Sequence, residues 1–314
     1  MTSTLKTFVA VTASFTVTSA CLLAAGDGWM TDFDEAKKEA EAGKKDLLMD
    51  FTGSDWCGWC IRLKEEVFSK EAFKKAAPDH FVMLELDFPK SVEQSESLKT
   101  QNSLLRDFYE IQGYPSIVLT DAEGRAYAKT GYQKGGAKAY LSHLEELRQI
   151  RVKRDEAFAK AESATGLEKA KLLQVVLKAI GDDDLIRKHY GTVADEIIEL
   201  DAKDQLGYKA NRDFQDKLDG LDEEIQKSLK AGGLDTVPAL IDEFVTANKL
   251  IGEQKQRVLL GKIGMHFQMQ QHEQSLKVAK RVVAIDPETE SGKSAAALVV
   301  QIEKFMQENA IDSE

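Results

Sequence analysis

The first half of the chain alternates between short apolar runs and amphipathic stretches. The apolar runs are bounded by turn-forming residues, which is typical of buried strands. The segments that we predict to be strands span residues 47–51, 81–87, 116–120 and 125–130, the last two joined by a turn at 121–124. The segments that we predict to be helices span residues 34–42, 57–77, 104–111 and 137–152, with an extended loop at 89–100. This order predicts an α/β sandwich.

After residue 152 the strand-like pattern stops and only helical periodicity remains. Apolar residues recur at helical spacing, for example at Leu173, Val176 and Leu177. We therefore predict an all-α domain of several helices. Residues 261–287 resemble one tetratricopeptide repeat, although no second copy follows at the expected period of about 34 residues.

The N-terminal segment predicts export from the cytoplasm. Lys6 is followed by an uncharged, apolar run over residues 8–25, which is typical of a secretory signal peptide. We expect cleavage near residue 25 and a periplasmic or secreted mature protein. An uncleaved anchor helix and lipid modification at Cys21 are the alternatives. The predicted domains are a signal peptide at 1–25, an α/β domain at 26–152 and a helical domain at 153–314.

The net charge and the cysteine content restrict the classes of partner and of function that fit this chain. The formal net charge of −11 argues against nucleic acid or an anionic membrane as the main partner. The chain has three cysteines, and removal of the signal peptide would also remove Cys21. Cys57 and Cys60 would then be the only cysteines, which leaves no structural disulfide framework and favours a redox role for this pair.

Cys57 and Cys60 form a Cys-x-x-Cys motif directly after a predicted strand and a polar loop. Residues three apart share one face of a helix, so the pair is close to disulfide geometry. At a helix start, the dipole and the free amides favour the thiolate of Cys57. The alternative is half of a zinc site. Zinc needs four ligands, however, and the five histidines show no ligand spacing, so we expect no metal.

Three segments carry a resemblance to a known family. They are residues 50–60 (Asp-Phe-Thr-Gly-Ser-Asp-Trp-Cys-Gly-Trp-Cys), 66–68 (Glu-Val-Phe) and 113–116 (Gly-Tyr-Pro-Ser). Residues 29–150 thereby resemble the thioredoxin-like superfamily, and within it the secreted bacterial branch with a Phe-Thr-Gly-Ser-x-Trp-Cys-x-x-Cys segment. This branch is similar to the C-terminal domain of thiol:disulfide interchange proteins. The resemblance implies a thioredoxin-like sandwich and does not reach the helical region.

The resemblance implies a role for each matching residue. Cys57 corresponds to the attacking cysteine and Cys60 to the resolving one, and Trp56 flanks the attacking sulfur. Pro115 corresponds to the cis-proline opposite the dithiol, where the backbone of Tyr114 can bind a substrate strand.

Two further positions depart from the family pattern. Asp50 corresponds to an acid that many members bury beneath the resolving cysteine, where it could take the proton of Cys60. It lies one residue further from the cysteines than usual, and Met83 stands where the family often has a lysine, so exposure at a strand end is the alternative. Trp59 replaces the usual proline or histidine, either as a hydrophobic rim or as a specific substrate contact.

These observations predict an extracytoplasmic thiol–disulfide oxidoreductase that reduces or exchanges protein disulfides. Its partners would be protein disulfides and an upstream thiol–disulfide electron donor, without a cofactor, a metal or nucleic acid. The alternative is a partner-binding helical-repeat protein that uses the thioredoxin-like part as a scaffold and has little redox turnover.

Overall fold

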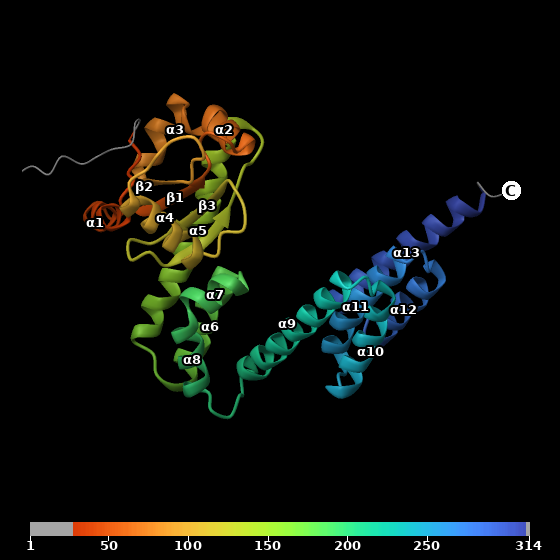
Figure 1. Cartoon of the computed structure of the whole chain (residues 1–314). Coiled ribbons are helices and arrows are strands. Elements are labelled where there is room, and N and C mark those ends of the chain that lie inside the picture. Colours follow the sequence, from red (N-terminus) through yellow and green to blue (C-terminus); the bar gives the residue numbers. More distant parts are fainter. Residues whose placement is uncertain (1–27, 312–314) are drawn as a thin grey trace, which may run out of the picture. The chain divides into compact units, whose positions relative to one another are not determined.

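The computed structural model describes residues 28–311. The predicted signal peptide and Cys21 lie outside this range. Contacts divide the chain into two compact units, Met1–Lys203 and Asp204–Glu314. Each unit is described separately below, and Figure 1 shows the elements of both.

The first unit is built on a four-stranded sheet with the order β2-β1-β3-β4. The strands are β1 (Asp46–Thr52), β2 (Phe81–Asp87), β3 (Ser116–Thr120) and β4 (Ala126–Thr130). β1 runs parallel to β2 and antiparallel to β3, which in turn pairs antiparallel with β4. All seven residues of β1 are buried. Burial on both faces explains why its apolar residues do not alternate with exposed polar ones, and its polar residues Asp46, Asp50 and Thr52 are buried as well.

Helices flank the sheet in two groups. They are α1 (Phe33–Gly43), α2 (Gly58–Leu63), α3 (Glu71–Ala76), α4 (Glu96–Phe108) and α5 (Gly136–Glu162). Gln101 on α4 accepts a hydrogen bond from Phe33 N and donates one to Thr31 O, which ties α4 to the start of α1. The other group is formed by α5, which packs against α3 and β4. The α/β sandwich predicted from the sequence is confirmed.

Two predicted segments differ from the structure. The single helix expected over 57–77 is divided into α2, the π-helical turn η1 (Lys64–Phe68), α3 and the short 3₁₀ turn η2 (Ala77–Asp79). The loop expected over 89–100 ends early, because α4 already begins at Glu96. Its N-cap is Ser95, whose Oγ accepts a hydrogen bond from Leu98 N at 3.3 Å.

Both outer strands of the sheet are covered. On the β2 side, Met30 N donates to Met83 O at 2.9 Å and Met30 O accepts from Glu85 N at 2.8 Å. On the β4 side, the short helix α7 (Asp183–His189) packs against the strand.

The helix α5 extends past residue 152 and leads into α6 (Gly166–Ile180), α7 and α8 (Gly191–Leu200). Arg154 on α5 is buried and donates to Asp121 Oδ2 at 3.0 Å and to the Tyr190 hydroxyl at 2.8 Å. Asp121 follows β3 and Tyr190 follows α7. The boundary expected at 152/153 therefore falls within α5, whereas the contacts divide the chain at 203/204.

The second unit is helical throughout its described residues, 204–311. Its elements are α9 (Tyr208–Lys230), η3 (Leu234–Thr236), α10 (Val237–Ala247), α11 (Gly252–Gln268), α12 (His272–Ile285) and α13 (Glu290–Ile311). Consecutive helices pack on one another from α10 to α13. Their shared core includes Ile241, Leu259, Ile263, Ala279 and Val282. The predicted helical region is thus confirmed, and its relation to tetratricopeptide repeats stays a prediction.

Candidate active site

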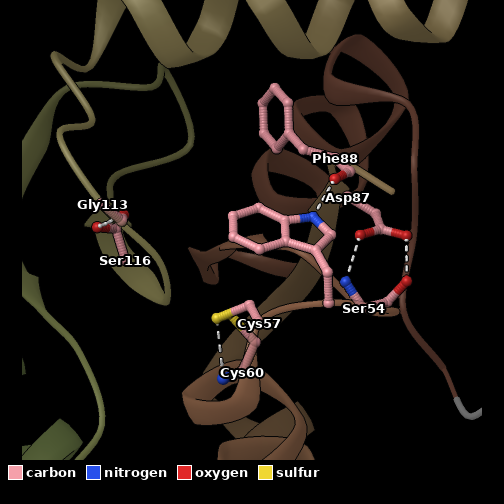
Figure 2. Close-up of a disulfide and its surroundings, with 8 residues drawn as sticks. Ser54, Cys57, Cys60, Asp87, Phe88, Gly113 and Ser116 are labelled. Atoms are coloured by element: carbon pink, nitrogen blue, oxygen red, sulfur yellow. Dashed lines mark hydrogen bonds between the residues drawn. A yellow bond between two sulfur atoms is a disulfide. The ribbon is translucent and has the colours of Figure 1, made fainter. Parts of the chain in front are cut away.

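The Cys-x-x-Cys motif lies where β1 passes into α2. Cys57 is the N-cap of α2 and forms a disulfide with Cys60, with 5.2 Å between the two Cα atoms. Cys60 N donates a hydrogen bond to Cys57 Sγ at 3.2 Å (Figure 2). After reduction, the same amide can stabilise a thiolate on Cys57, as can the positive end of the helix.

The loop before the motif is fastened to the end of β2. Asp87 accepts hydrogen bonds from Ser54 N at 2.9 Å and Ser54 Oγ at 2.6 Å, as Figure 2 shows. Asp55 accepts from the backbone amides of Lys90 and Ser91, and these bonds lower the pKa of Asp55. The side chains of Asp87 and Asp55 thus hold both sides of the loop, which fixes the position of Cys57.

Trp56 lies on one side of the dithiol. Its Nε1 donates to Phe88 O at 2.8 Å, and its ring meets the Tyr114 ring edge-on with 5.7 Å between the centroids. Lys90 Nζ lies 4.0 Å from the centre of the Trp56 ring. The indole remains 40% exposed, so a held aromatic surface stands beside the cysteines.

Trp59 lies between the two cysteines in sequence and is 53% exposed. Its ring is 5.2 Å from that of Tyr132 and 5.0 Å from the guanidinium of Arg62. The Tyr132 hydroxyl donates to Glu66 at 2.6 Å, which holds Tyr132 against the helix that follows the motif. The exposed Trp59 thus packs on the half-buried Tyr132, which comes from the segment after β4.

The Tyr114–Pro115 peptide bond is cis. The turn that contains it is closed by a hydrogen bond of 2.7 Å from Ser116 Oγ to Gly113 O (Figure 2). The Tyr114 ring also packs on Phe88, with 5.3 Å between the centroids. Through Trp56 and Phe88, the structure brings this turn next to the loop that carries the cysteines.

Asp50 is buried in β1, in spite of its longer spacing from the cysteines. It lines a cavity of about 160 Å³ together with Cys60. Its Oδ1 is buried without a hydrogen-bond partner among the described residues. Burial, and next the charge of Glu85, raise the pKa of Asp50 well above its ordinary value, against the opposing effect of Lys64.

Sequence reasoning missed Glu85 and Lys64. Glu85 is the residue paired with Asp50 across the two parallel strands, and Lys64 Nζ lies 3.5 Å from Glu85 Oε2. Met83, the expected counterpart of the family lysine, pairs with Leu48 instead. The signal in the sequence was Glu85 itself, because it interrupts an otherwise apolar strand.

The described residues show neither a metal-binding cluster nor a helix suited to cross a membrane. Between residues 28 and 311, no group of three or more His, Cys, Asp or Glu residues is arranged to hold a metal ion. Within the same range, no helix combines the length and the apolar character that a membrane crossing requires.

Comparisons with known proteins agree with this arrangement. The family model described as thioredoxin-like matches residues 28–122. The disulfide bond reductase DsbH of Chlamydia pneumoniae is 34% identical over 129 residues, which cover 41% of this chain and 78% of that protein. The thioredoxin-related protein DsbJ of the same organism is 31% identical over 103 residues, which cover 33% of this chain and 30% of DsbJ. A solved structure of a DsbH oxidoreductase is 32% identical, covers 43% of this chain and 94% of its own, and has a TM-score of 0.37.

Three findings lead to one assignment. They are the order of the strands, the disulfide at the start of α2 and the similarity to DsbH, of which this chain covers 78%. The protein is a member of the thioredoxin-like superfamily.

Proposed function

We propose that this protein is an extracytoplasmic thiol–disulfide oxidoreductase that reduces or exchanges disulfides of other proteins. The observation that carries the proposal is the Cys57–Cys60 disulfide at the start of α2, flanked by the exposed Trp56 and Trp59. A pair that can close within one helical turn can also open, and each change transfers two electrons.

The reaction starts from the reduced dithiol. The Cys57 thiolate attacks one sulfur of the substrate disulfide, so that a Cys57–substrate disulfide forms and the other substrate sulfur leaves as a thiolate. Cys57 is the attacking residue because it caps the helix and is the more exposed of the two cysteines, at 7% against 3%. Trp56 and Tyr114 form the surface on which the substrate strand lies, and the backbone beside Pro115 pairs with it.

Cys60 completes the reaction. It gives its proton to Asp50 through the shared cavity, and its thiolate then attacks Cys57 Sγ. The bond between Cys57 and the substrate breaks, the substrate sulfur leaves as a thiolate that takes up a proton, and the Cys57–Cys60 disulfide is restored. The substrate has gained two electrons, and an upstream dithiol donor must return the enzyme to its reduced state.

We propose reduction as the direction of electron flow. No histidine or other cation stands between Cys57 and Cys60 to stabilise the thiolate strongly, and strong oxidants depend on such stabilisation. The relative DsbH bears the name disulfide bond reductase, which supports the same direction. The apolar N-terminal run over residues 8–25 supports export to the periplasm or beyond.

Thiol trapping of the purified mature protein in a series of glutathione buffers tests the proposal. We expect Cys57 and Cys60 to cycle reversibly, the protein to reduce insulin disulfides, and Cys57→Ser to abolish this activity. Cys60→Ser should instead accumulate mixed disulfides with protein substrates. Ser228→Ala, far along the chain in α9, is a control that should leave the activity unchanged. A pair that stays oxidised, or reduced, across the whole series would refute the proposal.

A further inference from the structure

Three acidic residues, Asp50, Glu65 and Glu85, line the cavity beneath Cys60, and two of them lie on the sheet. Asp50 and Glu85 occupy paired positions on the adjacent parallel strands β1 and β2, and both line the cavity with Cys60. Side chains at paired positions point to the same face of a sheet, with the strands about 4.8 Å apart. The carboxyl groups of Asp50 and Glu85 are therefore neighbours on one face of the sheet, where Asp50 is buried and Glu85 is half-buried.

Exposure rises step by step from the interior to the surface. Asp50 is 6% exposed, the side chain of Glu85 is 20% exposed, and that of Lys64 is 62% exposed. Lys64 Nζ lies 3.5 Å from Glu85 Oε2. Glu85 is thus the carboxyl group that stands between the buried acid and the solvent, and Lys64 stands over it at the cavity mouth.

The cavity can also hold the water that proton transfer needs. Its volume of about 160 Å³ exceeds the volume of roughly 30 Å³ that one water takes in the liquid. Within residues 28–311 no protein group donates to Asp50 Oδ1, so this atom offers an acceptor to such a water. Glu85 and the Cys60 thiol provide further polar groups on the same walls.

The other charged and titratable groups near Asp50 come from three elements. Asp87 on β2 raises the pKa of Asp50 to a lesser degree than Glu85 does, and Lys64 lowers it. Glu65, from the same helical segment as Lys64, lines the cavity. Tyr140 on α5 is fully buried, and burial followed by the charge of Asp50 raises the pKa of its phenol, which keeps it neutral.

We propose that Glu85 is the proton-exchange partner of Asp50 and that Lys64 tunes this exchange; the inference rests on the proposed oxidoreductase function. When the Cys57–substrate disulfide is resolved, Cys60 passes its proton to ionised Asp50. The proton then moves from Asp50 to Glu85 and from Glu85 to solvent, which restores the Asp50 carboxylate. The electrons move only between sulfur atoms, so the carboxyl pair carries protons alone. Glu85 is a positioning residue, because it acts on Cys60 only through Asp50.

Two-step release of thionitrobenzoate from Ellman's reagent measures the resolving step directly. The reduced protein should release one equivalent when Cys57 attacks and a second when Cys60 resolves the mixed disulfide. Stopped-flow absorbance from about pH 5 to pH 9 gives the pH profile of each phase. In the wild type we expect the second phase to show the inflection of Asp50, whose pKa is raised by burial and by the charge of Glu85.

Opposite shifts of the inflection in two charge variants would identify Glu85 and Lys64 as the groups that act on Asp50. Glu85→Gln removes a negative neighbour of Asp50, so the inflection should move down by about half a pH unit or more. Lys64→Gln removes a positive neighbour, so the inflection should move up by a similar amount. A merely structural role would change the amplitude or the rate without opposite shifts. Glu71→Gln and Lys70→Gln, at the exposed start of α3, repeat the same charge changes outside the cavity and should leave the profile unchanged.

The outcomes separate the inference from the function on which it rests. A wild type that releases no second equivalent would overturn the proposed function and the inference with it. A wild type with a normal second phase whose inflection is the same in Glu85→Gln and Lys64→Gln would overturn the inference alone. Because Lys64 is exposed, its substitution tests the idea even if the strand variant folds poorly.

Discussion

The buried cation of Arg154 joins the thioredoxin-like sheet to the helices that follow it. The perturbation with the sharpest expected result is Arg154→Met, which keeps the aliphatic stem and removes the charge. In the native protein this guanidinium contacts Asp121 at 3.0 Å and the Tyr190 hydroxyl at 2.8 Å, and the side chains of Arg154 and Asp121 are only 1% and 2% exposed. Burial lowers the pKa of Arg154, but the opposite effects of Tyr190, Asp121 and Asp155 are larger. The net pKa is therefore raised, and the guanidinium is charged.

The size of the effect follows from what the substitution leaves behind. Removal of one partner of a buried ion pair costs about 3–5 kcal/mol, because the other charge stays buried without compensation. Asp121 keeps two hydrogen bonds from Arg125, one from its backbone N at 2.8 Å and one from its Nε at 3.0 Å, and the Arg125 side chain is 46% exposed. These two bonds offset part of the loss, so we expect a decrease of about 3 kcal/mol in the free energy of unfolding. Asp121→Asn in the same chain should recover part of it, since the uncompensated charge is then absent.

The tryptophans make the measurement specific to the first unit. All three of them, Trp29, Trp56 and Trp59, precede residue 203, so fluorescence during urea denaturation of the full chain reports this unit alone. Lys153→Met, an exposed neighbour on α5, is the matched control and should change the free energy of unfolding by less than about 0.5 kcal/mol. If Arg154→Met changes the free energy of unfolding by less than about 1 kcal/mol, the conclusion that this ion pair joins the sheet to the helices α6–α8 is refuted.

Three further predictions concern the domain boundary, the buried acid and the rim. Residues 26–203 should fold and reduce Ellman's reagent, whereas residues 26–152, which lack Arg154, should not give a cooperative urea transition; a stable 26–152 fragment would contradict this. Asp50 has a raised pKa in the folded protein, so its ionisation costs stability as the pH rises above its unfolded value of about 4; Asp50→Asn should remove this loss, about 1.4 kcal/mol per unit of pKa shift, in urea titrations at pH 4 and pH 8. Equal pH dependence in Asp50→Asn and wild type would refute this prediction. Trp59→Ala should lower the rate of insulin reduction about tenfold, while Trp59→Phe should retain most of that rate. An unchanged rate for Trp59→Ala would show that Trp59 is only a hydrophobic rim of the site.

Local patterns were sufficient for the sheet and for the helical character of the rest. The four strands and the cap position of Cys57 correspond to apolar runs and to a motif at a strand end, which depend on neighbours in sequence. The burial of Asp50 was implied by the family resemblance and not by the local pattern, which left exposure at a strand end open. The start of α4 was missed because its first turns are polar and pack little; Ser95 followed by Glu96 was the only local indication. The break of the helix after the cysteines involves a π-helical turn, which periodicity of apolar residues does not reveal.

Long-range contacts explain what sequence reasoning did not provide. Lys64 and Glu85 are 21 positions apart and meet only because α2 and η1 lie over the β1–β2 pair. Likewise, the sequence around Arg154 is that of an ordinary helix surface. Its partners Asp121 and Tyr190 come from segments before and after α5 and contact it only in the folded protein. In each case the role of the charged residue depends on a partner that is distant in sequence, so no short sequence segment contains the charged residue and its partner.

The covered edges of the sheet have a consequence for how the protein meets other chains. An open outer strand offers unpaired backbone groups on which an extended segment of another protein can add, and such addition leads to aggregation. Here Met30 occupies the outer side of β2 and α7 lies beside β4. Under the proposed function, the protein meets partly unfolded chains whose strands could add to its sheet. The Met30 bridge and α7 reduce the free backbone edge for such addition, which directs these chains to the surface around Cys57 and favours their release.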